Sequence, residues 1–207
     1  MSTRPPSRRS PPSVAPRVRA PFGAPGKVRI IGGSLRGSKL EVALVEGLRP
    51  SPDRVRETLF NWLAPVIVGS RCLDLYAGTG ALGIEAISRG AREVVLIERD
   101  PRAAQALREN LLRLKVEGAR LVEAHAERTL GESPQPFDVV FVDPPFGADA
   151  WAAICAALEH GWLARLAWVY LESPAEMAPT VPAHWECWRE ARAGGVRHAL
   201  YRRAPAR

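Results

Sequence analysis

Short, almost wholly apolar segments alternate with longer amphipathic segments between residues 71 and 173. The apolar segments predict strands at 71–76, 93–98, 119–124, 137–143 and 166–173, and the amphipathic segments predict helices at 81–89, 101–115, 126–131 and 149–161. Strands that are apolar on both sides are typical of a parallel sheet with helices on both faces. We therefore expect an α/β, Rossmann-like fold around a mostly parallel sheet.

The two ends of the chain depart from this alternation. Near the C-terminus, "WECWREA" and "VRHALYRR" flank "AGG" and predict an antiparallel hairpin, which brings the sheet to seven strands. Near the N-terminus, residues 28–42 predict a separate hairpin around glycine-rich turns. The segment "RPSPDRVRETLFNWL" at 49–63 predicts a helix with Ser51 as its cap and Pro52 in its first turn.

Basic charge is concentrated at the N-terminus. The 207 residues carry a formal charge of +7, yet residues 1–27 hold six Lys or Arg and no acid, and the remaining 180 residues hold 23 basic and 22 acidic side chains. Rich in proline and poor in large apolar side chains, residues 1–27 are predicted to be a disordered tail. Such a tail is either an arm that attracts nucleic acid or a solvated segment without a specific role. Its composition also fits an organellar transit peptide, although it shows no clear amphipathic helix.

The cysteines and the apolar runs exclude several classes of protein. Cys72, Cys155 and Cys187 lie far apart and form no C-x-x-C motif. We therefore expect neither a disulfide framework nor a metal site, and this pattern favours the cytoplasm. No apolar run approaches the roughly 18–20 residues that span a bilayer, so no membrane segment is expected.

A glycine-rich loop, "DLYAGTGALG" at 74–83, follows the first strand of the parallel sheet. Ligands of such sheets bind beyond the carboxyl ends of the strands. Glu98 ends the next strand, where a carboxylate can accept both hydroxyls of a ribose, a feature that nicotinamide and adenosine ligands share. Asp74 distinguishes them, because it would repel a pyrophosphate and attract the cationic groups of S-adenosylmethionine. The loop is therefore interpreted as an S-adenosylmethionine site.

A second motif, "DPPF" at 143–146, follows the fourth strand at the same edge of the sheet. An exocyclic amine on a base is a poor nucleophile, because its lone pair is delocalised into the ring. The carboxylate of Asp143 and the carbonyl of Pro144 can accept its N–H bonds, and Phe146 offers a flat face on which a base can stack. The structural alternative is a proline turn at a strand end, with Phe146 in the core.

The chain resembles the class I methyltransferases that modify amino groups, with the motif [D/N]-P-P-[F/Y]. "RIIGGSLRGSKL", "GLRPSPDRVRETLFNWL", "CLDLYAGTGALGIEA", "LIERD", "VFVDPPF" and "GWL" occur in order and at fitting spacing. Together they resemble the bacterial 16S rRNA (guanine(966)-N(2))-methyltransferases, the RsmD family, over about residues 28–203. "RPSPDRVRETLFN" is the piece most specific to that family. The resemblance implies a hairpin extension at 28–50 and a methyltransferase domain at 51–207.

The resemblance also implies a set of site residues. Asp143, Pro144 and Phe146 would orient and stack the guanine. The cofactor would contact Asp74, Ala77, Gly78, Gly80, Glu98, Arg99, His125, Ala126 and Asp143. The basic residues expected at RNA are Arg29, Arg36, Lys39, Arg49 and Arg54. Relatives often have Asp or Asn where His125 stands, so its contact with adenine is an open question.

The resemblance implies transfer of a methyl group to N2 of guanine 966 in small-subunit 16S rRNA. No metal is expected, because the sulfonium is already activated, and a monomer is the default expectation. One alternative is an amino methyltransferase that acts on adenine N6 of DNA or on a protein amide. The others are a nicotinamide-dependent dehydrogenase and a non-catalytic RNA-binding protein with the same fold.

Overall fold

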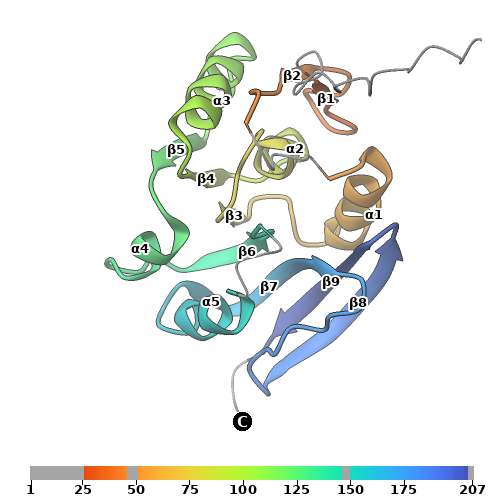
Figure 1. The fold of residues 1–207 in the computed structure, drawn as a ribbon, viewed down its shortest axis with the longest axis vertical. Helices are drawn as coiled ribbons and strands as arrows, with labels where there is room; N and C mark the ends of the chain where they lie inside the picture. The colour runs from red at the N-terminus through yellow and green to blue at the C-terminus, as the bar shows by residue number, and fades with distance from the viewer. Residues whose placement is uncertain (1–25, 46–50, 146–149, 205–207) are drawn as a thin grey trace, which may run out of the picture.

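The structure is a computed structural model, which describes residues 26–45, 51–145 and 150–204. Its main sheet has seven strands (Figure 1). They are β3 (Arg71–Asp74), β4 (Glu93–Glu98), β5 (Ala119–Glu123), β6 (Phe137–Val142), β7 (Leu163–Pro174), β8 (Trp185–Ala193) and β9 (Val196–Arg203). The strand order is β5-β4-β3-β6-β7-β9-β8, and β9 runs antiparallel to both of its neighbours while the other pairs are parallel. This arrangement confirms the predicted α/β fold with its C-terminal hairpin.

Helices cover both faces of the sheet, as the apolar strands predict. They are α1 (Asp53–Leu63), α2 (Ala81–Ser88), α3 (Pro101–Arg113), α4 (Ala126–Leu130) and α5 (Trp151–Leu158). Successive strand residues point to opposite faces. Cys72 accordingly packs in the core with α1, α2 and α3, and the adjacent Leu73 packs in the core with α4 and α5. Both faces are therefore buried, which explains why the strands carry so few polar residues.

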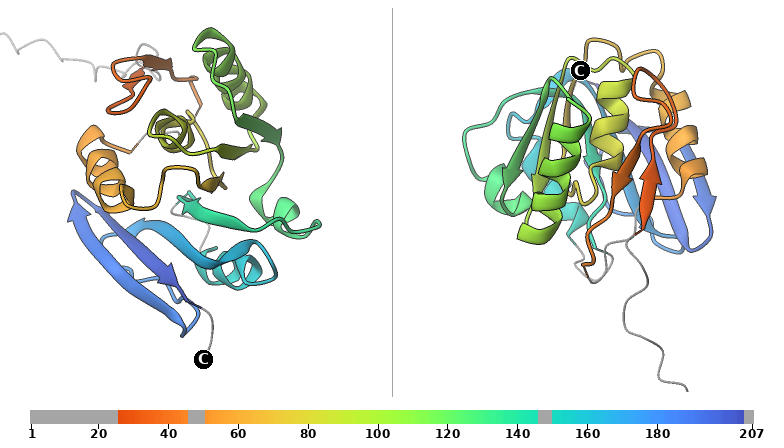
Figure 2. Two further views of the ribbon diagram at one scale, coloured as in Figure 1. Left: turned by 180° about the vertical axis from the view of Figure 1, so that it is seen from behind. Right: turned by 90° about the horizontal axis from the view of Figure 1, so that it is seen from above.

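A two-stranded hairpin, β1 (Lys27–Arg29) with β2 (Lys39–Glu41), lies alongside α1 and α2 (Figure 2). Its anchor is the fully buried carboxylate of Glu85, which accepts hydrogen bonds from the backbone N–H groups of Ile31 at 2.8 Å and Gly32 at 2.7 Å. Arg89 donates to the same carboxylate at 2.8 Å, and the buried Arg56 lies 3.6 Å from it. A buried acid with this many partners holds the extension firmly on the sheet domain.

The start of α1 differs from the sequence prediction. The helix begins at Asp53 with Pro52 at the N-cap position, and no side chain caps it. Ser51 is therefore not the cap, because its hydroxyl donates instead to Glu172 at 2.7 Å. The third arginine of the "RPSPDRVRET" motif, Arg56, is fully buried and donates to the carbonyl oxygen of Arg29, so it joins the helix to the hairpin.

Three other predictions concern membrane segments, the division into domains and the N-terminal tail. Among the described residues, no helix has the length and apolarity needed to cross a membrane. The predicted division into a tail, an extension and a methyltransferase domain stays a prediction. Most of the predicted tail lies outside the described residues.

Candidate active site

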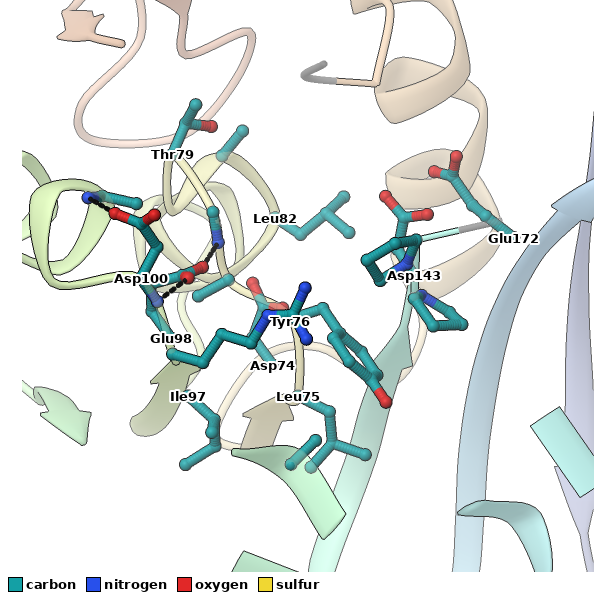
Figure 3. A pocket seen from close by; sticks show the side chains of 18 of the residues that line it. Asp74, Leu75, Tyr76, Thr79, Leu82, Ile97, Glu98, Asp100, Asp143 and Glu172 are labelled. Atoms are coloured by element: carbon teal, nitrogen blue, oxygen red, sulfur yellow. Dashed lines mark hydrogen bonds between the residues drawn. The ribbon is translucent and has the colours of Figure 1, made fainter. Parts of the chain in front are cut away.

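A cavity of about 760 Å³ opens at the carboxyl ends of β3, β4 and β6 (Figure 3). The glycine loop after β3 and the "DPP" segment after β6 both line it. They meet there because β3 pairs in parallel with β4 on one side and with β6 on the other, so their carboxyl ends share one edge. Two motifs that are 60 residues apart in sequence thus form a single site.

The backbone of the glycine loop holds the carboxylate of Glu98 in place. The N–H of Gly78 donates to one carboxylate oxygen at 2.8 Å, and the N–H of Asp100 donates to the other at 2.7 Å. Gly78 takes a positive φ of 52°, a conformation that glycine adopts without strain. Each carboxylate oxygen can accept two hydrogen bonds, so Glu98 retains acceptor capacity for a pair of hydroxyls.

Asp74 lies at the base of the loop and is 2% exposed. Its carboxylate accepts the N–H of Gly83, in the first turn of α2, at 3.1 Å. Burial raises the pKa of Asp74 to about 7, and the nearby carboxylates of Glu98 and Glu172 add to this effect. A cationic group bound beside Asp74 would lower this pKa again, whereas an anionic group would raise it further.

The charges around the cavity have one dominant sign. The described lining residues include six carboxylates, namely Asp74, Glu98, Asp100, Glu127, Asp143 and Glu172, and a single cation, Arg99. Such a wall disfavours the pyrophosphate of a nicotinamide dinucleotide and favours a ligand with positive charge. These residues fit S-adenosylmethionine, whose sulfonium and amino groups are cationic and whose ribose has two hydroxyls.

Asp143 and Pro144 lie on the β6 side of the same cavity. No described residue donates a hydrogen bond to the carboxylate of Asp143. Burial and then the neighbouring carboxylates, Glu172 before Asp74, hold the pKa of Asp143 well above its usual range. The sequence-predicted acceptor pair is therefore in the cavity with its carboxylate unpartnered. The third member of that prediction, Phe146, lies outside the described residues.

Glu172 is a cavity residue that the motif analysis did not identify. It is 4% exposed, and one of its oxygens, Oε1, accepts hydrogen bonds from the hydroxyls of Tyr170 and Ser51, both at 2.7 Å. Burial raises the pKa of Glu172. A signal was present in the sequence, because a carboxylate near the end of the apolar run "LAWVYLES" has to be buried or face a site.

The other predicted cofactor residues divide into two groups. Ala77, Arg99 and Ala126 line the cavity, while Gly80 and His125 do not. Gly80 is buried with a φ of 77°, and a Cβ there would lie 2.4 Å from a methyl carbon of Leu107, so backbone conformation and packing both favour glycine, while its contact with the cofactor stays a prediction. The exposed His125 precedes α4, and its carbonyl oxygen accepts the N–H of Thr129 at the start of that helix.

The predicted RNA-contacting residues are exposed wherever the structure describes them. These are Arg29, Arg36, Lys39 and Arg54, while Arg49 lies outside the described residues. Arg29 lies 3.4 Å from Asp53 and so reaches the start of α1, next to the cavity-lining Ser51 and Pro52. Contact of this group with RNA stays a prediction.

Comparison with known proteins identifies close relatives. The model of the family described as "Conserved hypothetical protein 95" matches residues 28–202. Ribosomal RNA small subunit methyltransferase D of Escherichia coli (strain K12) is 52% identical over 180 residues, which cover 86% of this chain and 91% of that protein. The protein of the same name from Haemophilus influenzae is 44% identical, covering 86% of this chain and 95% of that protein.

A solved structure extends the likeness to three dimensions. The structure of yhhF from Escherichia coli has a TM-score of 0.80 and 50% identity, and it covers 87% of this chain and all of that one. A chain from Streptococcus mutans, proposed to be a SAM-dependent methyltransferase, shares the fold alone, with a TM-score of 0.67 and 15% identity over 87% of this chain and 56% of that one.

Proposed function

Since this chain belongs to the ribosomal RNA small subunit methyltransferase D family, we propose that it methylates N2 of guanine 966 in 16S rRNA. The chain is an rRNA methyltransferase, and its cofactor is S-adenosylmethionine. The shared cavity supports an amine as the methyl acceptor, because the unpartnered carboxylate of Asp143 lies there at the same strand edge as Glu98 and Gly78.

The β3 and β4 side of the cavity would hold the cofactor. Glu98 would accept the ribose hydroxyls, because the backbone has already fixed its two oxygens. Asp74 would face the cationic methionine end, with Ala77, Gly78, Arg99 and Ala126 along the wall. When bound, S-adenosylmethionine supplies a methyl group that its sulfonium has already activated, so the protein needs to position the acceptor and does not need to activate the donor.

The β6 side would prepare the guanine amine. The carboxylate of Asp143 and the carbonyl of Pro144 would accept the N–H bonds of N2, which turns the nitrogen lone pair toward the methyl carbon. S-adenosylmethionine would supply its methyl group to this lone pair and leave as S-adenosylhomocysteine, and Asp143 would take up the proton that the amine loses. To reach this depth the target guanine has to leave its stack and enter the cavity, as in other base-modifying enzymes.

Membership of this family argues against the alternative functions, and the exact methyl acceptor, the oligomeric state and the cellular location are proposals. A dehydrogenase conflicts with the carboxylate-rich wall and with the relatives. Methylation of DNA adenine or of a protein amide is an outcome that the test below can reveal. We further propose that the enzyme acts as a monomer in the cytoplasm, where small-subunit rRNA is assembled.

The test is to incubate the protein with methyl-labelled S-adenosylmethionine and small ribosomal subunits that lack the modification, and to digest the RNA to nucleosides. A labelled N2-methylguanosine peak that maps to position 966 and is absent with Asp143→Ala is the expected result. Label in DNA or protein acceptors only would replace the substrate. Absence of label in every acceptor, despite bound cofactor, would contradict the proposed reaction.

A further inference from the structure

The carboxylate of Glu172 is held by one oxygen and free at the other. Oε1 accepts both the Tyr170 hydroxyl and the Ser51 hydroxyl at 2.7 Å. No described residue donates a hydrogen bond to Oε2. Because Glu172 lines the cavity, this second oxygen is left as an acceptor for whatever binds there. Two hydroxyls that fix one oxygen also fix the direction of the other.

Glu172 lies directly beside Asp143. β6 and β7 pair in parallel, with Val142 opposite Leu171, and continuing this register by one residue places Asp143 opposite Glu172. Figure 3 shows the two carboxyl groups next to each other on the same side of the cavity. Glu172 raises the pKa of Asp143, and a ligand with two adjacent N–H donors would offset this cost of ionisation.

Guanine presents such a pair of donors on its Watson–Crick edge. Its N1–H and its N2 amino group are neighbours, so two adjacent carboxylates can each accept one of them. Adenine has an unprotonated N1 at the corresponding place, whose lone pair would face a carboxylate oxygen and be repelled.

We propose that Glu172 selects guanine, with its Oε2 accepting the N1–H of the base while Asp143 binds the N2 amine. The inference rests on the proposed function and adds a residue that determines the base. It also gives a role to Ser51 in the family-like segment "RPSPDRVRET". The Ser51 hydroxyl does not cap α1 but donates to Glu172 and so orients its carboxylate toward the base.

The test changes the acceptor group in the enzyme and the N1–C6 side of the base. In Glu172→Gln the amide oxygen can still accept both hydroxyls, which places an NH₂ donor where Oε2 was. 2-Aminopurine keeps the exocyclic amine of guanine but lacks its O6 oxygen and has an unprotonated N1. We expect wild-type kcat/KM to fall roughly 10- to 100-fold when 2-aminopurine replaces the target guanine in reconstituted small subunits, which is the usual range for an unsatisfied buried hydrogen-bonding group.

Glu172→Gln is expected to reverse that preference. Its kcat/KM should fall roughly 10- to 100-fold on guanine, because two donors then face each other, and should rise on 2-aminopurine. The affinity for S-adenosylmethionine should change much less than kcat/KM on guanine, since the hydrogen bonds of Glu98 and the glycine loop are untouched. Glu186→Gln is the matched control, because it makes the same change on β8, where Glu186 pairs with Arg202 outside the cavity.

Three results separate the possibilities. A base preference in Glu172→Gln within about twofold of wild type would overturn the inference while leaving the proposed function intact. Failure of the wild-type enzyme to methylate guanine in the same subunits would overturn the proposed function itself. If Glu172→Gln does not fold, Tyr170→Phe keeps the carboxylate but removes one of the two hydrogen bonds that orient it. An unchanged guanine preference in that variant would also overturn the inference.

Discussion

The carboxylates on the two sides of the cavity are held in different ways. On the β3 and β4 side, Asp74 and Glu98 accept hydrogen bonds from backbone N–H groups of the glycine loop and of the residues after β4. On the β6 and β7 side, Glu172 accepts from two side-chain hydroxyls, and the carboxylate of Asp143 accepts from no described residue. Backbone donors make the first pair part of the fold, while the second pair keeps capacity for a substrate.

From this difference we expect substitutions of the second pair to lower activity more than stability. The largest effect is expected at Asp143. Asp143→Asn should lower kcat by about 10²- to 10⁴-fold, because the amide oxygen can still accept an N–H of the amine but the amide cannot take up the proton that the amine loses. The unfolding temperature should not fall, since burial and Glu172 already disfavour the charge of Asp143. Single-turnover kinetics and thermal unfolding measure the two properties on the same protein.

Asp138→Asn is the matched control on the same strand. Asp138 is the second residue of β6, at the end opposite the cavity, and its carboxylate accepts the backbone N–H of Arg71 at 2.8 Å. The expected result is the reverse of the previous one, a loss of about 1 kcal/mol in stability with kcat nearly unchanged. If Asp138→Asn reduced kcat as strongly as Asp143→Asn, the separation between fold and chemistry would be wrong.

The second-largest effect is expected at Glu98. In Glu98→Gln only one amide oxygen remains for the N–H groups of Gly78 and Asp100, so one donor loses its partner. We expect the affinity for S-adenosylhomocysteine to fall roughly 10- to 100-fold and stability to fall by about 1–3 kcal/mol. Calorimetric titration measures the first and denaturant unfolding the second. Glu93→Gln, at the other end of β4 in a bridge to Arg71, should change neither by as much.

The two sides also differ in how much of them the sequence predicts. The glycine loop and Glu98 follow from local spacing, because loop and strand end are short-range features that one motif contains. Asp143 follows from its motif as well. Glu172 depends on the pairing of β6 with β7 and on a hydroxyl from Ser51, which is 121 residues away in sequence. No local pattern contains that contact, and the same long-range bond explains why Ser51 is not the helix cap.

Gly80 is the reverse case, a residue that the local motif predicts for the site but that does not line the cavity. Its place in the glycine motif suggests a ligand contact, and the structure places it instead against Leu107 of α3. The fold required a residue without Cβ there, and a sequence motif does not distinguish a glycine that approaches a ligand from one that approaches a neighbouring helix. The sequence therefore predicts the fold and the cofactor half of the site better than it predicts the base-binding half.

A smaller effect is a pH dependence carried by Asp74. Its pKa is about 7 in the folded protein against an ordinary 3.8, so between these values the folded state binds more protons than the unfolded state. Stability of the ligand-free protein should therefore fall as the pH rises through this window. A cationic ligand favours the ionised form, so affinity for S-adenosylmethionine should rise as the pH rises through about 7.

Asp74→Asn isolates this effect, because Glu98, Asp143 and Glu172 remain as the other carboxylates that face the ligand. Binding measured by calorimetry between pH 6 and 8, at about half-unit steps, should lose part of its slope in the variant. A slope identical to that of the wild type would mean that Asp74 is already ionised across this range, or that it does not face the cationic end of the cofactor.

The smallest effects are expected at the exposed cations, which lie outside the cavity and belong to neither half of the comparison. Arg36, Lys39 and Arg54 are exposed on the hairpin and on α1. If each neutralises one phosphate, replacement by alanine should reduce the slope of log K against log salt by roughly one per residue, with little change in kcat at saturating RNA. Filter binding of the rRNA at several salt concentrations measures the slope. Arg120, an exposed cation on β5, is a matched control. Equal losses at Arg120 and Arg54 would indicate diffuse attraction, and losses confined to the hairpin and α1 would place the RNA on the side of the cavity that Ser51 borders.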